Sequence, residues 1–323
     1  MSLTDQPVAG LGASLAAMNS LISHRGPDGS GTWQHESGHV GLTHRRLEII
    51  DLTTGAQPMQ GEAGEWITYN GEIYNYLELR DELGASSFRT TSDTEVILRA
   101  YAKWGAGALT HLRGMFAFAL WDERRGRLFS ARDRFGMKPF YYAVVDGTFL
   151  FASEPKALLP FLPAIETDVD GLRDYLTFQF CLDGKTLFKG VRELPAGHSL
   201  EVVGGSVRVE RYWDVQFETD LTHPARYFET ELQGRMADSV RVHLRADVPV
   251  GAYLSGGLDS SIVAALAAEG GQRGMMTFNG RFAMGPEYDE SGYARELAAD
   301  RGLELHIFDI TVDDFARNMH RVI

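Results

Sequence analysis

The stretch that decides the fold of the second half of the chain lies at residues 250–261. It reads Val-Gly-Ala-Tyr-Leu-Ser-Gly-Gly-Leu-Asp-Ser-Ser. The apolar run 250–254 predicts a buried strand, and residues 260–269 predict a helix shortly after the glycine pair. Two glycines allow a tight turn that brings backbone N–H groups close to a ligand, and a helix start attracts anions. We therefore predict a phosphate-binding loop between a strand and a helix.

The side chains of this loop add to the prediction. Ser255, Ser260 and Ser261 offer hydroxyl donors, and Asp259 fits an anion site if Mg²⁺ bridges it to the phosphates. The loop lacks Gly-Lys-Ser/Thr, which excludes a Walker A motif. The alternative is an ordinary strand–helix turn whose serines cap the helix. The complete eight-residue pattern favours the phosphate interpretation.

Strands and helices alternate around the loop. Strands are expected at 275–279 and 304–309, with a helix at 290–301 between them, which is typical of a parallel, doubly wound sheet. Before the loop, residues 225–245 predict an amphipathic helix, because an apolar residue recurs at every fourth position. These residues are Phe228, Leu232, Met236, Val240 and Leu244.

The first two-thirds of the chain instead favours antiparallel strands. Short turns separate three pairs of apolar runs, 115–122 with 127–132, 140–145 with 148–152, and 200–203 with 207–209. Further short elements are helices at 13–24 and 75–84 and β-type runs at 47–51 and 66–69. Such a mixture predicts a layered α+β domain. The polar segment 214–225 contains Pro224, so we place domains at 1–213 and 214–323.

The composition of the chain excludes several classes of function. The chain has 323 residues, 44% of them hydrophobic, which suits two globular domains. Its net charge of -13 excludes nucleic acid and anionic membranes as partners, because both need a basic face. No apolar run reaches the ~20 residues of a membrane span. Cys181 is the only cysteine, which excludes an intrachain disulfide and fits the cytoplasm.

The loop resembles the pyrophosphate loop of ATP pyrophosphatases, and motifs before it narrow the likeness. They include Tyr-Asn-Gly-Glu-Ile-Tyr-Asn at 69–75 and Ser-Asp-Thr-Glu at 92–95. The other matching stretches lie at 24–29, 46–51, 132–136, 151–154 and 194–198. Together these stretches resemble the glutamine-hydrolysing asparagine synthetases. The resemblance implies an N-terminal-nucleophile αββα sandwich, followed by a partial parallel-sheet α/β ATP-pyrophosphatase domain.

The resemblance also assigns residues to a glutamine site. Arg46 would grip the substrate carboxylate, Asn70 and Gly71 would form the oxyanion hole, and Glu72 and Asp93 would receive the α-ammonium. Leu47, Ile49 and Ile50 would complete the glutamine-binding set. Taken singly, these residues also have plain structural interpretations. They are a surface arginine, an Asn-Gly turn and a helix cap at 92–93.

In the second domain the resemblance implies ATP and Mg²⁺ as ligands. Asp259 would hold Mg²⁺ through the pyrophosphate, and Gly280 would touch adenine unless it is only a turn at the end of a strand. The implied ATP-binding residues are Leu254, Ser255, Gly256, Gly257, Leu258, Asp259, Ser260, Ser261 and Gly280.

The sequence departs from the family at both ends. The family begins Met-Cys-Gly-Ile, and the cysteine attacks glutamine, whereas residue 2 here is Ser. Cys181 is no substitute, because its apolar setting favours a buried, inert thiol. The chain also ends at Ile323, before the family's second pyrophosphate motif. We therefore expect a chain truncated at both ends and, by itself, inactive in both half-reactions.

For the parent protein, the resemblance implies transfer of the glutamine amide nitrogen to aspartate. ATP is cleaved to AMP and pyrophosphate, asparagine is the product, and the partners are these small molecules. The resemblance also allows for a homodimer. One alternative is a related ligase acting on another carboxylate, as β-lactam synthetases and sugar- or peptide-modifying relatives do. Another is a non-catalytic relative that binds nucleotide or a partner.

Overall fold

The structure is a computed structural model that describes residues 1–272, 274–282, 285 and 289–322. The chain divides into two compact units, Met1–Phe217 and Glu218–Ile323. The first unit corresponds to the predicted α+β part of the chain, and the second to the predicted strand–helix alternation.

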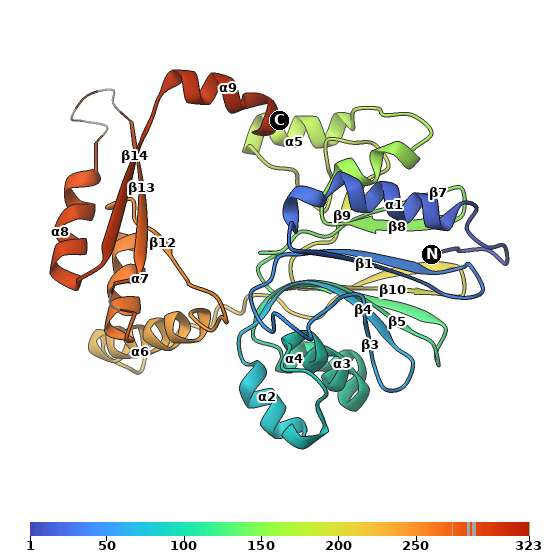
Figure 1. Cartoon of the computed structure of the whole chain (residues 1–323), viewed down its shortest axis with the longest axis horizontal. Coiled ribbons are helices and arrows are strands. Elements are labelled where there is room, and N and C mark those ends of the chain that lie inside the picture. The colour runs from blue at the N-terminus through green and yellow to red at the C-terminus, as the bar shows by residue number, and fades with distance from the viewer. Residues whose placement is uncertain (273, 283–284, 286–288, 323) are drawn as a thin grey trace. The chain divides into compact units, whose positions relative to one another are not determined.

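Helices and strands alternate irregularly along the first unit (Figure 1). Its helices are α1 (Leu11–Leu21), α2 (Tyr76–Leu83), α3 (Asp93–Trp104), α4 (Ala108–His111) and α5 (Val169–Phe178). Single 3-10 turns are η1 (Ser23–Arg25), η2 (Ala85–Ser87), η3 (Gly105–Gly107), η4 (Pro155–Ala157) and η5 (Leu159–Phe161). The strands are β1 (Gly29–Gln34), β2 (Gly41–Arg46), β3 (Met59–Gln60), β4 (Trp66–Ile73), β5 (Gly114–Asp122), β6 (Arg127–Arg132), β7 (Tyr141–Val145), β8 (Thr148–Ala152), β9 (Arg192–Glu193), β10 (His198–Val203) and β11 (Ser206–Arg211).

The strands of the first unit form two layers. One layer is a sheet in the order β11-β10-β6-β5-β4-β3. The pair β1-β2 and the sheet β8-β7-β9 form the other layer. Within this unit, α3 and α4 lie on one side of the strands and α1 lies on the other (Figure 1).

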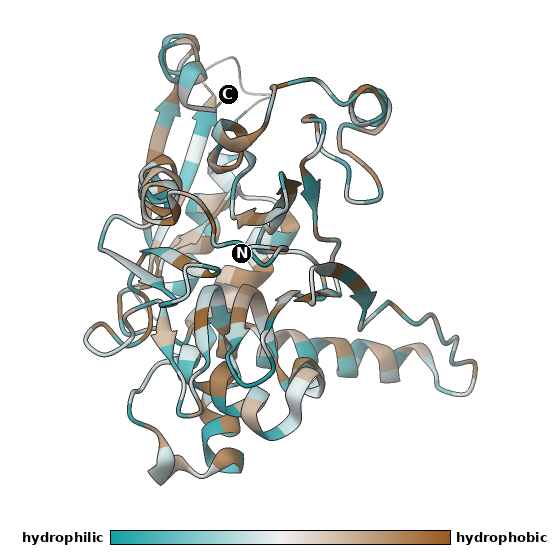
Figure 2. Ribbon diagram, turned by 90° about the vertical axis from the view of Figure 1, so that its right-hand side faces the viewer, coloured by the Kyte–Doolittle hydropathy of each residue, from teal (hydrophilic) through white to brown (hydrophobic). Residues whose placement is uncertain are grey.

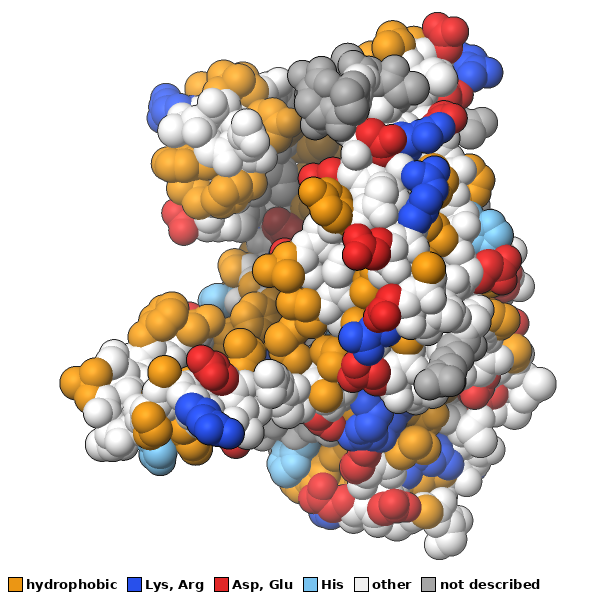
Figure 3. Space-filling view, turned by 90° about the vertical axis from the view of Figure 1, so that its left-hand side faces the viewer, with side chains coloured by type: hydrophobic (Ala, Val, Ile, Leu, Met, Phe, Trp, Pro, Cys, Tyr) orange, Lys and Arg blue, Asp and Glu red, His pale blue; other side chains and the backbone are white. Residues whose placement is uncertain are grey.

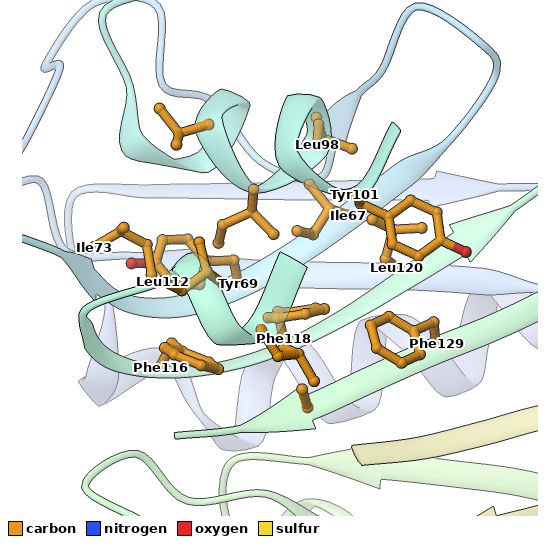
Figure 4. Packing of buried hydrophobic residues seen from close by; sticks show 14 of the residues in the cluster. Ile67, Tyr69, Ile73, Leu98, Tyr101, Leu112, Phe116, Phe118, Leu120 and Phe129 are labelled. Carbon is orange, nitrogen blue, oxygen red and sulfur yellow. The ribbon is translucent and has the colours of Figure 1, made fainter. Parts of the chain in front are cut away.

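Strand β5 shows why these layers form, because its side chains alternate between the two faces of its sheet. Phe116, Phe118 and Leu120 pack with α3 and α4 in one buried cluster (Figure 4). Ala117 and Ala119 point the other way, into a second cluster shared with β2 and β8. Both faces of the sheet are therefore covered. Figure 2 shows hydrophobic and hydrophilic residues interspersed along the elements.

Helix α1 supplies the fourth layer. Its Met18 packs with Leu158, Val191 and the β8 residue Leu150. The order is thus helices, sheet, sheet, helix, which confirms the αββα sandwich.

The three predicted hairpins of the first unit are confirmed as β5–β6, β7–β8 and β10–β11. The predicted helices at 13–24 and 75–84 appear as α1 with η1 and as α2. The predicted β-type run at 47–51 is wrong, because this segment is a loop. Asp51 adopts a left-handed φ of 56° there. Its carboxylate holds the loop by accepting hydrogen bonds from the N–H groups of Thr54 and Thr91 at 2.7 and 2.9 Å.

The second unit contains the predicted parallel sheet, in the order β12-β13-β14. Its elements are α6 (Ala225–His243), β12 (Ala252–Tyr253), α7 (Leu258–Glu269), β13 (Met276–Phe282), α8 (Ser291–Arg301), β14 (Glu304–Ile310) and α9 (Val312–Val322). Strand β12 is shorter than the predicted 250–254. The small core joins Leu254, Ala264 and Ala294.

Large hydrophobic side chains also lie on the surface of this unit, among them Tyr253, Leu258, Tyr293 and Phe308. Figure 3 shows that hydrophobic side chains are frequent between charged ones on the face viewed there.

Candidate functional site

One pocket of the first unit, with a volume of about 230 Å³, gathers the predicted glutamine site. Its walls come from β2 and the loop after it, from the end of β4, and from the start of α3. The predicted residues that line it are Arg46, Leu47, Ile49, Ile50, Asn70, Gly71, Glu72 and Asp93. The predicted residues, which are up to 47 positions apart in the sequence (Arg46 to Asp93), therefore meet at one cavity.

Arg46 ends β2 and is held at the pocket by its own loop. Its Nη1 donates to Glu48 Oε1 at 3.1 Å, and its Nη2 donates to the carbonyl oxygens of Ile50 and Asp51. Gly55 leaves room for this arrangement, since a Cβ there would lie 2.4 Å from Arg46 Nη2. The guanidinium is thus fixed in place while it still borders the pocket, as a carboxylate-binding group must be.

Asn70 and Gly71 lie inside strand β4, opposite Ala117 and Phe116 of β5. The alternative interpretation of this pair as a hairpin turn is therefore wrong. A Cβ at Gly71 would lie 2.1 Å from the Met115 carbonyl oxygen, so the strand pairing requires glycine here. Among the described residues, the buried Asn70 Nδ2 has no hydrogen-bond partner. A buried, unpaired donor is costly, and this one lies at a pocket where a ligand oxygen would satisfy it.

Asp93 begins α3 directly after the N-cap Ser92, whose Oγ accepts from the Thr94 N–H at 3.1 Å. Asp93 is 4% exposed, and its carboxylate accepts from Tyr69 Oη at 2.8 Å and from the Ile73 N–H at 2.9 Å. Burial raises the pKa of Asp93, and these hydrogen bonds oppose the rise. A ligand ammonium would favour the charged form.

Sequence reasoning missed several polar side chains that line the pocket, among them Tyr69, His44 and Lys138. Burial, assisted by the charge of Arg46, lowers the pKa of His44 to about 4, so its imidazole is neutral at neutral pH. Burial also lowers the pKa of Lys138. Tyr69 is the first residue of the motif at 69–75, which could have indicated it, whereas Lys138 lies two residues beyond the motif at 132–136. His44 directly precedes Arg45-Arg46 and carried no signal of its own.

In the second unit, the predicted loop turns tightly between β12 and α7. Gly256 has a φ of 95°, and a Cβ on it would lie 2.5 Å from the Glu290 carbonyl oxygen. Ser255 Oγ and Ser260 Oγ lie 2.9 Å apart, and Ser255 Oγ accepts from the Gly257 N–H at 3.2 Å. Two of the predicted hydroxyl donors therefore stabilise the loop itself.

Helix α7 begins at Leu258, two residues earlier than predicted, with Gly257 as its N-cap. Among the described residues, no side chain caps this end. The first-turn N–H groups thus keep the capacity to bind an anion. Leu254 is buried, whereas Leu258 and Asp259 are exposed.

Two further predicted residues can be placed. Gly280 lies within β13, paired with Phe308 of β14, so its interpretation as a turn at the end of a strand is wrong. The described residues contain no group of three or more His, Cys, Asp or Glu side chains suited to a metal ion. A Mg²⁺ ion beside Asp259 would therefore need phosphate oxygens as further ligands.

Two protein families match this chain. The glutamine amidotransferase domain family matches residues 4–213, and the asparagine synthase family matches residues 231–323. The chain belongs to the glutamine amidotransferase domain family, and its second part matches the asparagine synthase family.

Curated members of the family resemble the chain along most of its length. Asparagine synthetase (glutamine-hydrolyzing) 1 of Bacillus subtilis (strain 168) is 39% identical over 310 residues, which are 95% of this chain and 48% of that protein. Amidase chry2 of Gibberella zeae is 38% identical over 308 residues, which are 89% of this chain and 45% of that protein. The chain thus spans about half the length of the curated relatives it matches.

Among solved structures, the chain is similar to a glutamine phosphoribosylpyrophosphate amidotransferase from B. subtilis complexed with ADP and GMP. The identity is 15% and the TM-score 0.48, over 94% of this chain and 80% of that one. Within the described residues, no helix combines the length and apolarity needed to cross a membrane.

Proposed function

We propose that the protein transfers the amide nitrogen of glutamine to the side-chain carboxylate of aspartate, with cleavage of ATP to AMP and pyrophosphate. The observation that carries the glutamine half is the buried Asn70 Nδ2, which has no hydrogen-bond partner among the described residues and lines the same pocket as Arg46 and Asp93. Arg46 and Asp93 complement the α-carboxylate and the α-ammonium of a bound amino-acid amide, and Asn70 Nδ2 can donate to its reacting carbonyl oxygen.

Each pocket residue has a defined task in this proposal. Arg46 binds the α-carboxylate through its guanidinium, and Asp93 with Glu72 binds the α-ammonium. Asn70 Nδ2, together with the Gly71 N–H, donates to the oxygen on which negative charge develops when the amide is attacked. A rigid strand holds both donors, so little reorganisation accompanies the reaction.

The pocket lining, as far as the structure describes it, contains no cysteine. Cys181 lies elsewhere, its Sγ 3.4 Å from the Gly171 carbonyl oxygen, and burial raises the pKa of its thiol. Cys181 is therefore a poor nucleophile. We place the nucleophile on a segment joined to the amino side of Met1.

The contacts of the first residues support this placement. Ser2 pairs antiparallel with Thr148 of β8, and the Met1 amine donates to the Phe149 carbonyl oxygen at 2.8 Å. On the other side, the Ser2 N–H donates to the His39 carbonyl oxygen at 2.8 Å, just before β2. An extension of this segment in the same register would run along β8 towards Ser153, which lines the pocket.

The test appends a strand to the full chain. Two versions start with cysteine or serine and differ at no other position, and both are assayed for glutamate released from glutamine. We expect hydrolysis only with the cysteine version, and its loss in Asn70→Ala. Binding of glutamine without hydrolysis by the cysteine version would overturn the amidotransferase proposal.

For the second half-reaction, the residues present fit the phosphates of ATP. The loop has a glycine where any side chain would clash, and the start of α7 has N–H groups free of a side-chain cap among the described residues. Bound ATP supplies an activated leaving group for the carboxylate, and Asp259 would meet Mg²⁺ at the pyrophosphate. The chain's own contribution is to orient the loop and hold the phosphate charge.

The acceptor of the amide nitrogen has a second candidate besides aspartate. A fungal relative named an amidase matches this chain about as well as the asparagine synthetases do, which favours a second candidate, amidation of another carboxylate. Aspartate-dependent exchange of labelled pyrophosphate into ATP, measured on the polypeptide extended to the length of the relatives, separates these candidates. If labelled pyrophosphate exchanges into ATP equally well with and without aspartate, asparagine synthesis is excluded. If no carboxylate supports exchange, a non-catalytic relative is favoured. A homodimer remains a prediction.

A further inference from the structure

Asn279 connects the middle strand of the second unit to the glycine loop. It follows Phe278 in β13 and is 3% exposed. Its Nδ2 donates to the Leu254 carbonyl oxygen at 2.8 Å and to the Ser255 carbonyl oxygen at 3.2 Å. The backbone ladder between β12 and β13 ends at Tyr253 and Phe278, so this side chain continues the pairing where β12 has ended.

The orientation of the amide follows from chemistry. Both partners are carbonyl oxygens, which only accept, so the Asn279 NH₂ group must face them. Its Oδ1 is then left buried and, among the described residues, has no hydrogen-bond partner. An unsatisfied buried acceptor is costly. The presence of Asn279 is therefore better explained by the two loop carbonyls that its NH₂ group binds than by packing.

These hydrogen bonds fix the direction of two consecutive peptide groups. In a planar trans peptide the C=O and the N–H point in opposite directions. When the carbonyls of Leu254 and Ser255 point towards Asn279, the N–H groups of Ser255 and Gly256 point away from it. In the part of the chain that the structure describes, neither N–H has an acceptor.

The other side of the loop is fixed independently. Gly256 lies against the Glu290 carbonyl at the start of α8, where no Cβ would fit. The loop is thus held between α8 and Asn279. As far as the structure describes the chain, the Ser255 and Gly256 N–H groups are unpaired and lie beside a start of α7 that no side chain caps. Successive backbone N–H groups of this kind form a cradle for an anion.

We propose that Asn279 is a positioning residue of the nucleotide site, which presets the Ser255 and Gly256 N–H groups for the phosphates. The inference rests on the proposed use of ATP and adds to it the residue that shapes the loop. Asn279 acts through the loop backbone and is not assigned a contact with the nucleotide.

The experiment compares binding of inorganic pyrophosphate, ATP and adenosine to the full chain by calorimetry. In Asn279→Ala we expect affinity for pyrophosphate and ATP to fall roughly 10- to 100-fold, the loss typical of one hydrogen bond to a charged group. Adenosine, which lacks phosphates, should keep its affinity. Asn279→Ser retains one donor and should show a smaller loss, which keeps the test informative if the alanine variant does not fold.

Thr277→Val is the matched control. Thr277 is equally buried in the same strand, and its Oγ1 donates to the Glu304 carbonyl oxygen at 3.1 Å, away from the loop. In Thr277→Val, the ratio of the affinity for pyrophosphate to the affinity for adenosine should equal that of the unmodified chain. Equal weakening of adenosine and pyrophosphate in the Asn279 variants, or no weakening, would overturn the inference while leaving ATP use intact. If the unmodified chain bound no pyrophosphate, both the inference about Asn279 and the proposed use of ATP would be overturned.

Discussion

The glutamine pocket and the nucleotide loop are built in opposite ways. The pocket assembles Arg46, Asn70 and Asp93 from three separate elements, and Asp93 and the Asn70 Nδ2 atom are buried. The loop uses eight consecutive residues, several of them exposed. The geometry of the nucleotide loop is therefore determined by the local backbone of one turn. The geometry of the glutamine pocket, which needs paired strands, depends on the fold of the whole first unit.

The largest expected effect tests this dependence on strand pairing. In Gly71→Ala, the new Cβ would lie 2.1 Å from the Met115 carbonyl oxygen in the middle of β4 and β5. We expect the first unit to lose about 3 kcal/mol or more of unfolding free energy, measured by denaturant titration. Gly256→Ala should instead leave the second unit folded and abolish pyrophosphate binding. A stable Gly71→Ala chain would contradict the comparison.

The next effect concerns Arg46. Arg46→Ala removes the carboxylate-binding group and also the hydrogen bonds that hold the loop after β2. We expect glutamine affinity to fall about 100-fold, the scale of a lost charged hydrogen bond with its partner. Calorimetry with glutamine measures this, and Arg46→Lys, which keeps the charge without the fork, should recover only part of the affinity. Unchanged affinity would remove Arg46 from the site.

Two asparagines of the first unit, the buried Asn19 and the half-buried Asn70, distinguish a structural amide from a functional one. Asn19 Nδ2 donates to Thr43 Oγ1 at 2.6 Å and to the His44 carbonyl oxygen at 3.0 Å, so Asn19→Ala should cost about 1–3 kcal/mol of unfolding free energy. Asn70 Nδ2 has no partner among the described residues, so Asn70→Ala should cost clearly less. Equal costs in thermal or denaturant unfolding would mean that Asn70 is a structural residue.

A smaller effect is a shift in pH dependence. Burial raises the pKa of Asp93, and glutamine's ammonium needs the ionised carboxylate, so glutamine affinity should fall as the pH drops through this raised pKa. Tyr69→Phe removes a hydrogen bond that favours the ionised form. The loss of affinity should therefore begin at a higher pH in Tyr69→Phe. Dissociation constants measured between about pH 4 and pH 8 would show this shift, and an unshifted profile would separate Tyr69 from the titration of Asp93.

The smallest effect is expected at Cys181. Because its thiol lies outside the pocket and burial raises its pKa, Cys181→Ser should leave glutamine affinity unchanged. It should also leave unchanged the hydrolysis rate of the cysteine-extended chain. A clear loss of hydrolysis in Cys181→Ser would show that the glutamine site is wrongly placed.

Local signals explain what could be predicted without tertiary structure. Asp146-Gly147 specified the β7–β8 hairpin, because few residues adopt the left-handed conformations of that turn. The α6 helix followed from its four-residue apolar repeat. The glycine pair at 256–257 marked the loop, since only glycine tolerates the close approach to Glu290. Each of these signals lies within a few residues of the structure that it predicts.

The remaining features were decided by contacts between distant segments. Residues 47–51 have the apolar content of a strand, but the hydrogen bonds of Asp51 to Thr54 and Thr91 fold them into a loop. Asn70-Gly71 has the composition of a turn, yet pairing with β5 keeps it in a strand. The sequence by itself therefore determined the motifs, their order and the family. Only the tertiary structure decided which side chains share the pocket and which buried amides stay unpaired, because burial and long-range pairing outweigh local preference.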